Sequence, residues 1–176
     1  YADGRSVTKV LQGDWTKNLA GNYGNFQNSH DGYGYGVDPT TMCAYPHFKK
    51  VRFEGKFPMA ILTFEDALFP GKVVMTAFNP LIPLDADNSS LPAAFFDIKI
   101  ISHEENVKYT VILSVSNPFE QAENKLLPSE KYTAIQMKHY GVDKEELAYG
   151  DLTIAVDAKD GIYQEYWYRG GWRDKV

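Results

Sequence analysis

The sequence predicts an all-β fold, specifically an antiparallel β-sandwich, on three observations. Short runs of residues alternate between apolar and polar side chains, which is the periodicity of a half-buried strand. Glycine and proline separate these runs at short intervals, as turn residues do. Only "DKEELA", near residue 145, has the composition of a helical turn. Many short antiparallel strands with such turns favour a sandwich, and we expect residues 1–176 to form one domain.

The clearest alternation occurs in two neighbouring runs. "AAFFDIKI" (93–100) places Ala94, Phe96, Ile98 and Ile100 on one face, and "VKYTVILSV" (107–115) does the same with Val107, Tyr109, Val111, Leu113 and Val115. The polar linker "SHEEN" between them is short. We therefore expect the two runs to pair as an antiparallel hairpin.

A second hairpin is predicted upstream of the first. "FPMAILTF" (57–64) and "KVVMTAF" (72–78) are apolar on both faces, as strands in the middle of a sandwich are, and "ALFPGK" between them carries a Pro-Gly turn signal. Three later runs also alternate and predict strands. They are "YTAIQMK", "LTIAVDA" and "IYQEYWY", at 132–138, 152–158 and 162–168.

One segment interrupts the strand pattern. "NPLIPLDADNSSLP" (79–92) holds three prolines, and proline cannot donate a hydrogen bond to a sheet ladder. The segment must therefore connect strands instead of running inside one. Because it carries Leu81, Ile82 and Leu84, we expect it to lie against the edge of the sandwich or against another domain.

Composition excludes several classes of protein. The net charge of −5 is spread along the chain without a Lys/Arg cluster that could neutralise phosphates, which argues against nucleic acid as a partner. Cys43 is the only cysteine, so neither an internal disulfide nor a cysteine-based zinc site can form. The apolar runs are far shorter than the roughly 18 residues of a membrane span. We expect no transmembrane segment and no cofactor, and a cytoplasmic location.

Candidate functional residues concentrate in "HDGYGYGVDPTTMCAYPHF" (30–48), which has no apolar periodicity and is predicted to be a loop. Aromatic rings stack on the apolar face of a sugar, and polar groups bind its hydroxyls. The candidates for contact with substrate or with another domain are His30, Asp31, Tyr33, Tyr35, Asp38, Tyr45 and His47, with Trp15 and Trp167 as further rings. For any single ring, filling the end of a sandwich is the simpler explanation.

Known catalytic and metal motifs are not found. The glycines at 32, 34 and 36 lack the preceding strand and following helix of a dinucleotide site. "DADNSS" (85–90) begins like a calcium loop, but Phe96 stands where the closing acid belongs, so a surface loop is the better interpretation. His30 and His47 favour structural roles over a metal pair. Paired acids such as Glu65 and Asp66 are expected to be solvated. We expect no metal site.

Two segments resemble the N-terminal domain of glycoside hydrolase family 116, which includes bacterial β-glucosidases and the non-lysosomal β-glucosylceramidase. They are "FEGKFPMA" (53–60) and "AFNPLIPLDADNSSLP" (77–92), the second being similar to the family's AF-x-P-x-IPL…S-x-P signature. "YWYRGGW" (166–172) is also similar to the family. The glycine-rich segment that usually precedes this region in the family is missing.

The resemblance implies a supersandwich-like module of a larger two-domain enzyme. In the family an (α/α)6 barrel follows the sandwich and carries a glutamate nucleophile and an aspartate acid/base. Retaining hydrolysis needs two carboxyls about 5–5.5 Å apart, and by resemblance both lie outside this chain. We therefore assign no catalytic residue here. The implied partners are the barrel of the same enzyme and a β-glucoside near the interface.

Two alternatives remain open at this stage. A free-standing carbohydrate-binding module would use the same aromatic residues without a partner domain, and a structural sandwich would bind no sugar. The chain starts at Tyr1 instead of Met and stops within an aromatic-rich run. On these grounds we expect a fragment of a longer protein that docks to a catalytic domain.

Overall fold

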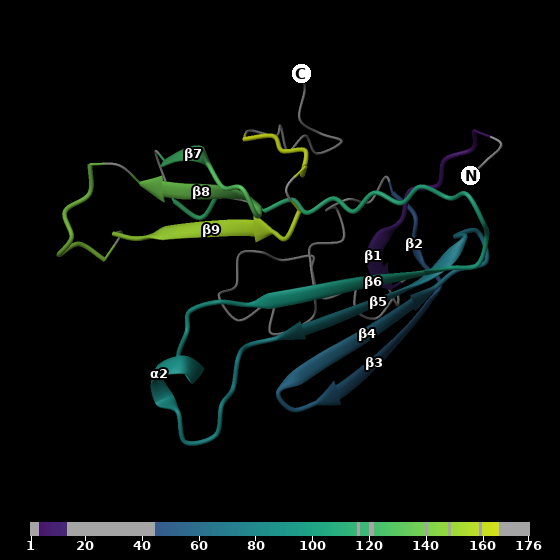
Figure 1. Ribbon diagram of the computed structural model, residues 1–176, viewed down its shortest axis with the longest axis horizontal. Helices are drawn as coiled ribbons and strands as arrows, with labels where there is room; N and C mark the ends of the chain where they lie inside the picture. Colours follow the sequence, from purple (N-terminus) through teal and green to yellow (C-terminus); the bar gives the residue numbers. More distant parts are fainter. Residues whose placement is uncertain are drawn as a thin grey trace, which may run out of the picture. The chain divides into compact units, whose positions relative to one another are not determined.

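The computed structural model describes residues 4–13, 45–115, 117–119, 122–139, 141–147, 149–158 and 160–165 (Figure 1). Within them lie nine strands and one four-residue helix, and the two larger sheets are antiparallel. The all-β prediction is confirmed. The chain divides into two compact units, 1–110 and 111–176. The expectation of a single domain stays a prediction.

The first unit is built on a four-stranded sheet. Its strands lie in chain order and are joined as successive hairpins: β3 (Lys50–Lys56), β4 (Met59–Glu65), β5 (Gly71–Phe78) and β6 (Phe95–Ser102). The hairpin of β4 and β5 is the one that the sequence predicts. These two strands are central in the sheet.

The register of the sheet gathers apolar side chains on one face. Val51, Phe64, Val73 and Ile100 form one row across the four strands, and Phe53, Leu62, Met75 and Ile98 form the next. Because side chains alternate between the faces of a strand, both rows point to the same side. The predicted alignment of Phe96, Ile98 and Ile100 on one face of β6 is confirmed.

A small parallel sheet covers one end of this apolar face. It consists of β1 (Val10–Gly13) and β2 (His47–Phe48). Phe48, Phe64 and Val73 are buried, and Leu11, Val51 and Phe69 pack against them. The Phe48 ring lies 5.5 Å from that of Phe64 and 5.2 Å from that of Phe69, at the tilted and edge-on angles that aromatic pairs prefer.

The opposite face of the sheet is charged near β3. Glu65 lies 3.2 Å from Lys50 and 4.0 Å from Lys72, while Glu54 lies 3.1 Å from Arg52. All these side chains are at least partly exposed, so each pair contributes at most about 1 kcal/mol. The asymmetry between the two faces explains why only one of them is covered by β1 and β2.

The strand predicted at 107–115 is wrong. This segment forms no strand, and β6 pairs with β5 instead. The chain turns at Asn106, whose φ is +59°, and the Tyr109 hydroxyl donates a hydrogen bond to the Pro70 carbonyl at 2.9 Å. The Tyr109 ring also contacts Phe69, at 5.9 Å between centroids. The Tyr109 hydroxyl also lies 2.8 Å from the Ser102 Oγ at the end of β6, so this residue is anchored by its side chain where the sequence predicts a strand.

The second unit is a three-stranded antiparallel sheet. β8 (Thr133–His139) lies between β7 (Ala122–Leu127) and β9 (Asp151–Val156), and it buries Ala134 and Met137. β8 and β9 are predicted by their alternation, whereas β7 is not. The strand predicted at 162–168 is wrong for residues 162–165, which form none, and its remainder lies outside the described residues.

The proline segment 79–92 connects β5 to β6 and contains the only helix of the described residues, α2 (Ala86–Ser89). The prediction that it runs between strands is confirmed. In Figure 1 it lies at the same end of the sheet as the β3–β4 turn. None of the described helical residues form a span long and apolar enough to cross a membrane.

The buried phenylalanines predict a large contrast between two substitutions in this chain. Phe64→Ala removes a fully buried ring and should lower the free energy of unfolding by about 3–5 kcal/mol. Phe53→Ala removes an exposed ring on the neighbouring strand and should cost less than about 1 kcal/mol. Urea denaturation of the two variants measures the difference, and equal losses would place the core elsewhere.

Candidate functional site

The structure describes two of the seven candidate residues. Tyr45 and His47 lie at the end of the aromatic loop, and Tyr45 is exposed. Five others lie outside the described residues, as do both tryptophan candidates: His30, Asp31, Tyr33, Tyr35, Asp38, Trp15 and Trp167. The proposal that these residues form one site therefore stays a prediction.

His47 is positioned by the parallel pairing of β1 and β2. Its Nδ1 lies 3.2 Å from the Gly13 carbonyl, to which it donates in the tautomer that protonates this nitrogen. Its own carbonyl accepts a hydrogen bond from the Lys9 ammonium at 3.2 Å. The two contacts tie the loop's end to β1 and to the residue before it, which supports the structural role that the sequence favours for this histidine.

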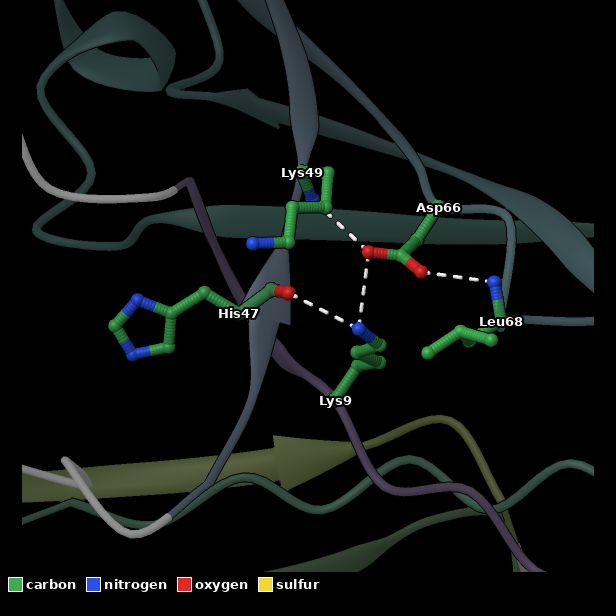
Figure 2. A network of polar contacts seen from close by, with 5 residues as sticks. All are labelled: Lys9, His47, Lys49, Asp66 and Leu68. Carbon is green, nitrogen blue, oxygen red and sulfur yellow. Dashed lines mark hydrogen bonds and ion pairs between the residues drawn. The ribbon is translucent and has the colours of Figure 1, made fainter.

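A buried ion pair lies beside this loop end (Figure 2). The Lys9 Nζ lies 2.9 Å from the Asp66 Oδ2, and the two side chains are only 4% and 2% exposed. Asp66 also accepts hydrogen bonds from the backbone N–H groups of Lys49, at 3.1 Å, and Leu68, at 2.9 Å. The network joins the segment before β1, the β2–β3 junction and the β4–β5 turn.

The surroundings of Asp66 favour its ionised form. Burial by itself raises the pKa of this carboxyl, since it removes water from the charge. The hydrogen bonds from Leu68, Lys9 and Lys49 and the charge of Lys9 outweigh burial, so that the pKa lies below its usual value. Asp66 is therefore ionised at neutral pH and cannot act there as a general acid.

An open groove of about 410 Å³ runs along the same end of the sheet. Its lining includes Lys50, Glu65, Asp66, His103 and Glu104. The carboxylates of Glu65 and Asp66 are both paired with lysines. The groove thus offers polar groups to a ligand, while these two acids already serve the fold.

The calcium-like start of "DADNSS" is a helix cap. Asp85 accepts a hydrogen bond from the Asn88 backbone N–H at 3.0 Å and one from the Asn88 side chain at 2.6 Å. These hydrogen bonds lower the pKa of Asp85. Among the described residues, no group of three or more His, Cys, Asp and Glu side chains could hold a metal ion.

Sequence reasoning missed the Lys9–Asp66 pair. The expectation of a solvated Glu65–Asp66 doublet is wrong for Asp66, whose side chain is buried, whereas Glu65 stays partly exposed. Asp66 follows the last residue of β4, and an aspartate that begins a turn is a signal for capping of the next N–H groups. Its partner Lys9 lies 57 residues away, and no local pattern identifies it.

Asp66→Asn should strongly destabilise the chain. The substitution leaves the buried Lys9 ammonium without its counter-charge, and we expect a loss of about 3–5 kcal/mol in the free energy of unfolding at pH 7. Glu65→Gln is the matched control, because it removes an exposed partner of two lysines and should cost at most about 1 kcal/mol. Urea denaturation measures both, and similar losses would argue against a special role for Asp66.

The same pair predicts a pH dependence. Because the pKa of Asp66 is depressed in the folded chain, its stabilisation is fully present above the usual value of 3.8. It is lost as the pH falls through the lower folded pKa. The difference in unfolding free energy between the wild-type chain and Asp66→Asn should therefore be constant from pH 7 down to about 4 and shrink below it. If the difference in unfolding free energy between the two chains increased as the pH fell, the pKa of Asp66 would not be depressed in the folded chain.

Comparison with protein families supports the resemblance seen in the sequence. The family model for "beta-glucosidase 2, glycosyl-hydrolase family 116 N-term" matches residues 2–173, almost the whole chain. The comparison with curated proteins found no match. The matched residues include the four-stranded sheet and the proline segment that connects its strands β5 and β6. The chain therefore belongs to glycoside hydrolase family 116, of which it is an N-terminal domain.

Proposed function

We propose that the chain is a non-catalytic β-sandwich module of a retaining β-glucosidase or glucosylceramidase-like enzyme. It docks to an (α/α)6 catalytic domain of the same polypeptide, which holds the nucleophile and the acid/base. The single observation that carries this proposal is the family match over residues 2–173. It implies a larger enzyme, because the matched model is that of an N-terminal part.

The chemistry of the described acids supports a non-catalytic role. Retaining hydrolysis needs one carboxyl that donates a proton and a second that attacks the sugar. Asp66 is held ionised by its buried pair with Lys9, and Asp85 caps α2. Both carboxylates maintain the fold, so neither is offered as the nucleophile or the acid/base.

The aromatic loop is the part of the module that we propose to meet the sugar or the barrel's rim. The end of this loop is held in place, since His47 is hydrogen-bonded to Gly13 and to Lys9. Tyr45 is exposed two residues before His47. A ring next to an anchored residue can stack on a glucoside with little loss of conformational entropy.

Tyr45→Ala in the full-length enzyme tests the role of the loop. We expect KM for an aryl β-glucoside to rise roughly two- to tenfold with a smaller change in kcat, as loss of about 0.5–1.5 kcal/mol of ring contact implies. Tyr132→Ala is the matched control, because Tyr132 is 43% exposed and Tyr45 is 44% exposed. If both variants behave like the wild type, the loop does not line the sugar site.

The alternative of a free-standing carbohydrate-binding module makes a different prediction. The isolated chain should then bind glucose polymers in a calorimetric titration. The docking module should neither bind them tightly nor hydrolyse aryl β-glucosides alone.

A further inference from the structure

The aromatic loop belongs to the longer connection between β1 and β2. β1 ends at Gly13 and β2 begins at His47, and the two strands are paired in parallel. The His47 Nδ1 lies 3.2 Å from the Gly13 carbonyl, although 34 positions separate the two residues in the sequence. Bringing together the ends of so long a connection costs conformational entropy, which contacts at its base must offset.

Backbone pairing supplies only part of these contacts. β2 is two residues long, and its register with β1 shifts between Val10 and Gly13. Before β2, the Val10 N–H donates a hydrogen bond to the Pro46 carbonyl at 3.1 Å. A two-stranded sheet of this size is marginally stable by itself. Side chains must therefore contribute to holding the two ends together.

Lys9 provides such a contact from inside the fold. Its Nζ lies 3.2 Å from the His47 carbonyl and 2.9 Å from the Asp66 Oδ2, and Figure 2 shows the ammonium between these two oxygens. The Lys9 side chain is only 4% exposed. A buried ammonium requires both acceptors, because little water can reach it to replace either of them. Lys9 thus joins the backbone of β2 to the β4–β5 turn.

Asp66 is also bonded to the backbone on the other side of His47. It accepts a hydrogen bond from the Lys49 N–H at 3.1 Å and one from the Leu68 N–H at 2.9 Å. Lys49 follows β2 directly. The backbone around His47 is therefore held from two sides by one carboxylate, through Lys9 before it and through Lys49 after it.

Tyr45 precedes this anchored backbone. The next two residues are Pro46 and His47, whose carbonyls accept hydrogen bonds from the Val10 N–H and the Lys9 ammonium. Proline also restricts the backbone of the residue before it to extended conformations. The direction of the Tyr45 side chain is thus set by its neighbours, and the residue is 44% exposed, which leaves part of it open to a ligand.

We propose that Lys9 is a positioning residue for the sugar contact of Tyr45. This inference rests on the proposed function, in which the loop meets the glucoside, and it adds the residue that holds the ring in place. Lys9 is buried and acts through the His47 carbonyl and Asp66. An ordered ring loses little conformational entropy on binding. Loosening it should therefore weaken substrate binding without removing a catalytic group.

A double-mutant cycle in the full-length enzyme tests the proposal. We expect Lys9→Met to raise KM for an aryl β-glucoside roughly two- to tenfold with kcat nearly unchanged. In the Tyr45→Ala background the same substitution should raise KM no further, because residues that act as one unit are not additive. Lys50→Met is the matched control and should leave KM unchanged, since Lys50 is a 78% exposed lysine.

The outcomes of the cycle separate the two proposals. If Lys9→Met leaves KM at the wild-type value, or if its effect adds to that of Tyr45→Ala, the positioning role is overturned and the sugar contact of the loop stands. If Tyr45→Ala leaves KM unchanged, the sugar contact itself is overturned, and the role of Lys9 in substrate binding falls with it.

A second variant guards against a loss of folding. Lys9→Met alone leaves the buried Asp66 carboxylate without its counter-charge, which lowers stability. Lys9→Met combined with Asp66→Asn removes both buried charges, while the His47 carbonyl still lacks its donor. We expect the same rise in KM from this pair of substitutions. A wild-type KM in the paired variant overturns the proposal.

The mobility of Tyr45 gives a readout that does not depend on activity. In 15N relaxation measurements on chain 1–176, we expect the backbone order parameter of Tyr45 to fall from about 0.85 to below about 0.6 in the paired variant. That of Phe64 should stay at about 0.85. An unchanged value at Tyr45 overturns the positioning role. A lowered value in an enzyme that cleaves no aryl β-glucoside supports the positioning of the ring and overturns the proposed function.

Discussion

The first unit depends on a buried ion pair between Lys9 and Asp66. The Lys9 ammonium and the Asp66 carboxylate are almost fully buried, and each would be costly to bury alone. Asp66 also accepts the N–H groups of Lys49 and Leu68. Three segments that are distant in the sequence must therefore meet at one point before the pair is satisfied. The pair thereby helps to specify how the small sheet of β1 and β2 is placed against the four-stranded sheet.

The aromatic core follows from this arrangement. Phe48 and Phe69 lie on either side of the network, and the Phe48 ring packs against the rings of both Phe64 and Phe69. The polar network fixes the position of the covering strands, and the rings bury apolar area beside it. The two effects act together, since the same short segments contribute to both.

Among the described residues of the first unit, the buried core lies at one end of the four-stranded sheet. The strands β3 to β6 continue beyond the covered rows, and their side chains remain apolar where no described residue covers them fully. An independent domain would be expected to bury or replace such residues, because they promote association. A module within a larger enzyme can retain them, which agrees with the membership of this chain in family 116.

The sequence by itself determined the all-β class, the central hairpin of β4 and β5, the strands β8 and β9 and the role of the proline segment as a connection. These features depend on period-two patterning and on turn chemistry, both of which act between near neighbours. Tertiary structure decided the rest. The alternation at 107–115 predicts a strand, yet the segment forms none, and Tyr109 within it is hydrogen-bonded to the Pro70 carbonyl in the β4–β5 turn. The burial of Asp66 depends on Lys9, 57 residues away, because a charge can leave water only where a distant chain segment supplies its partner.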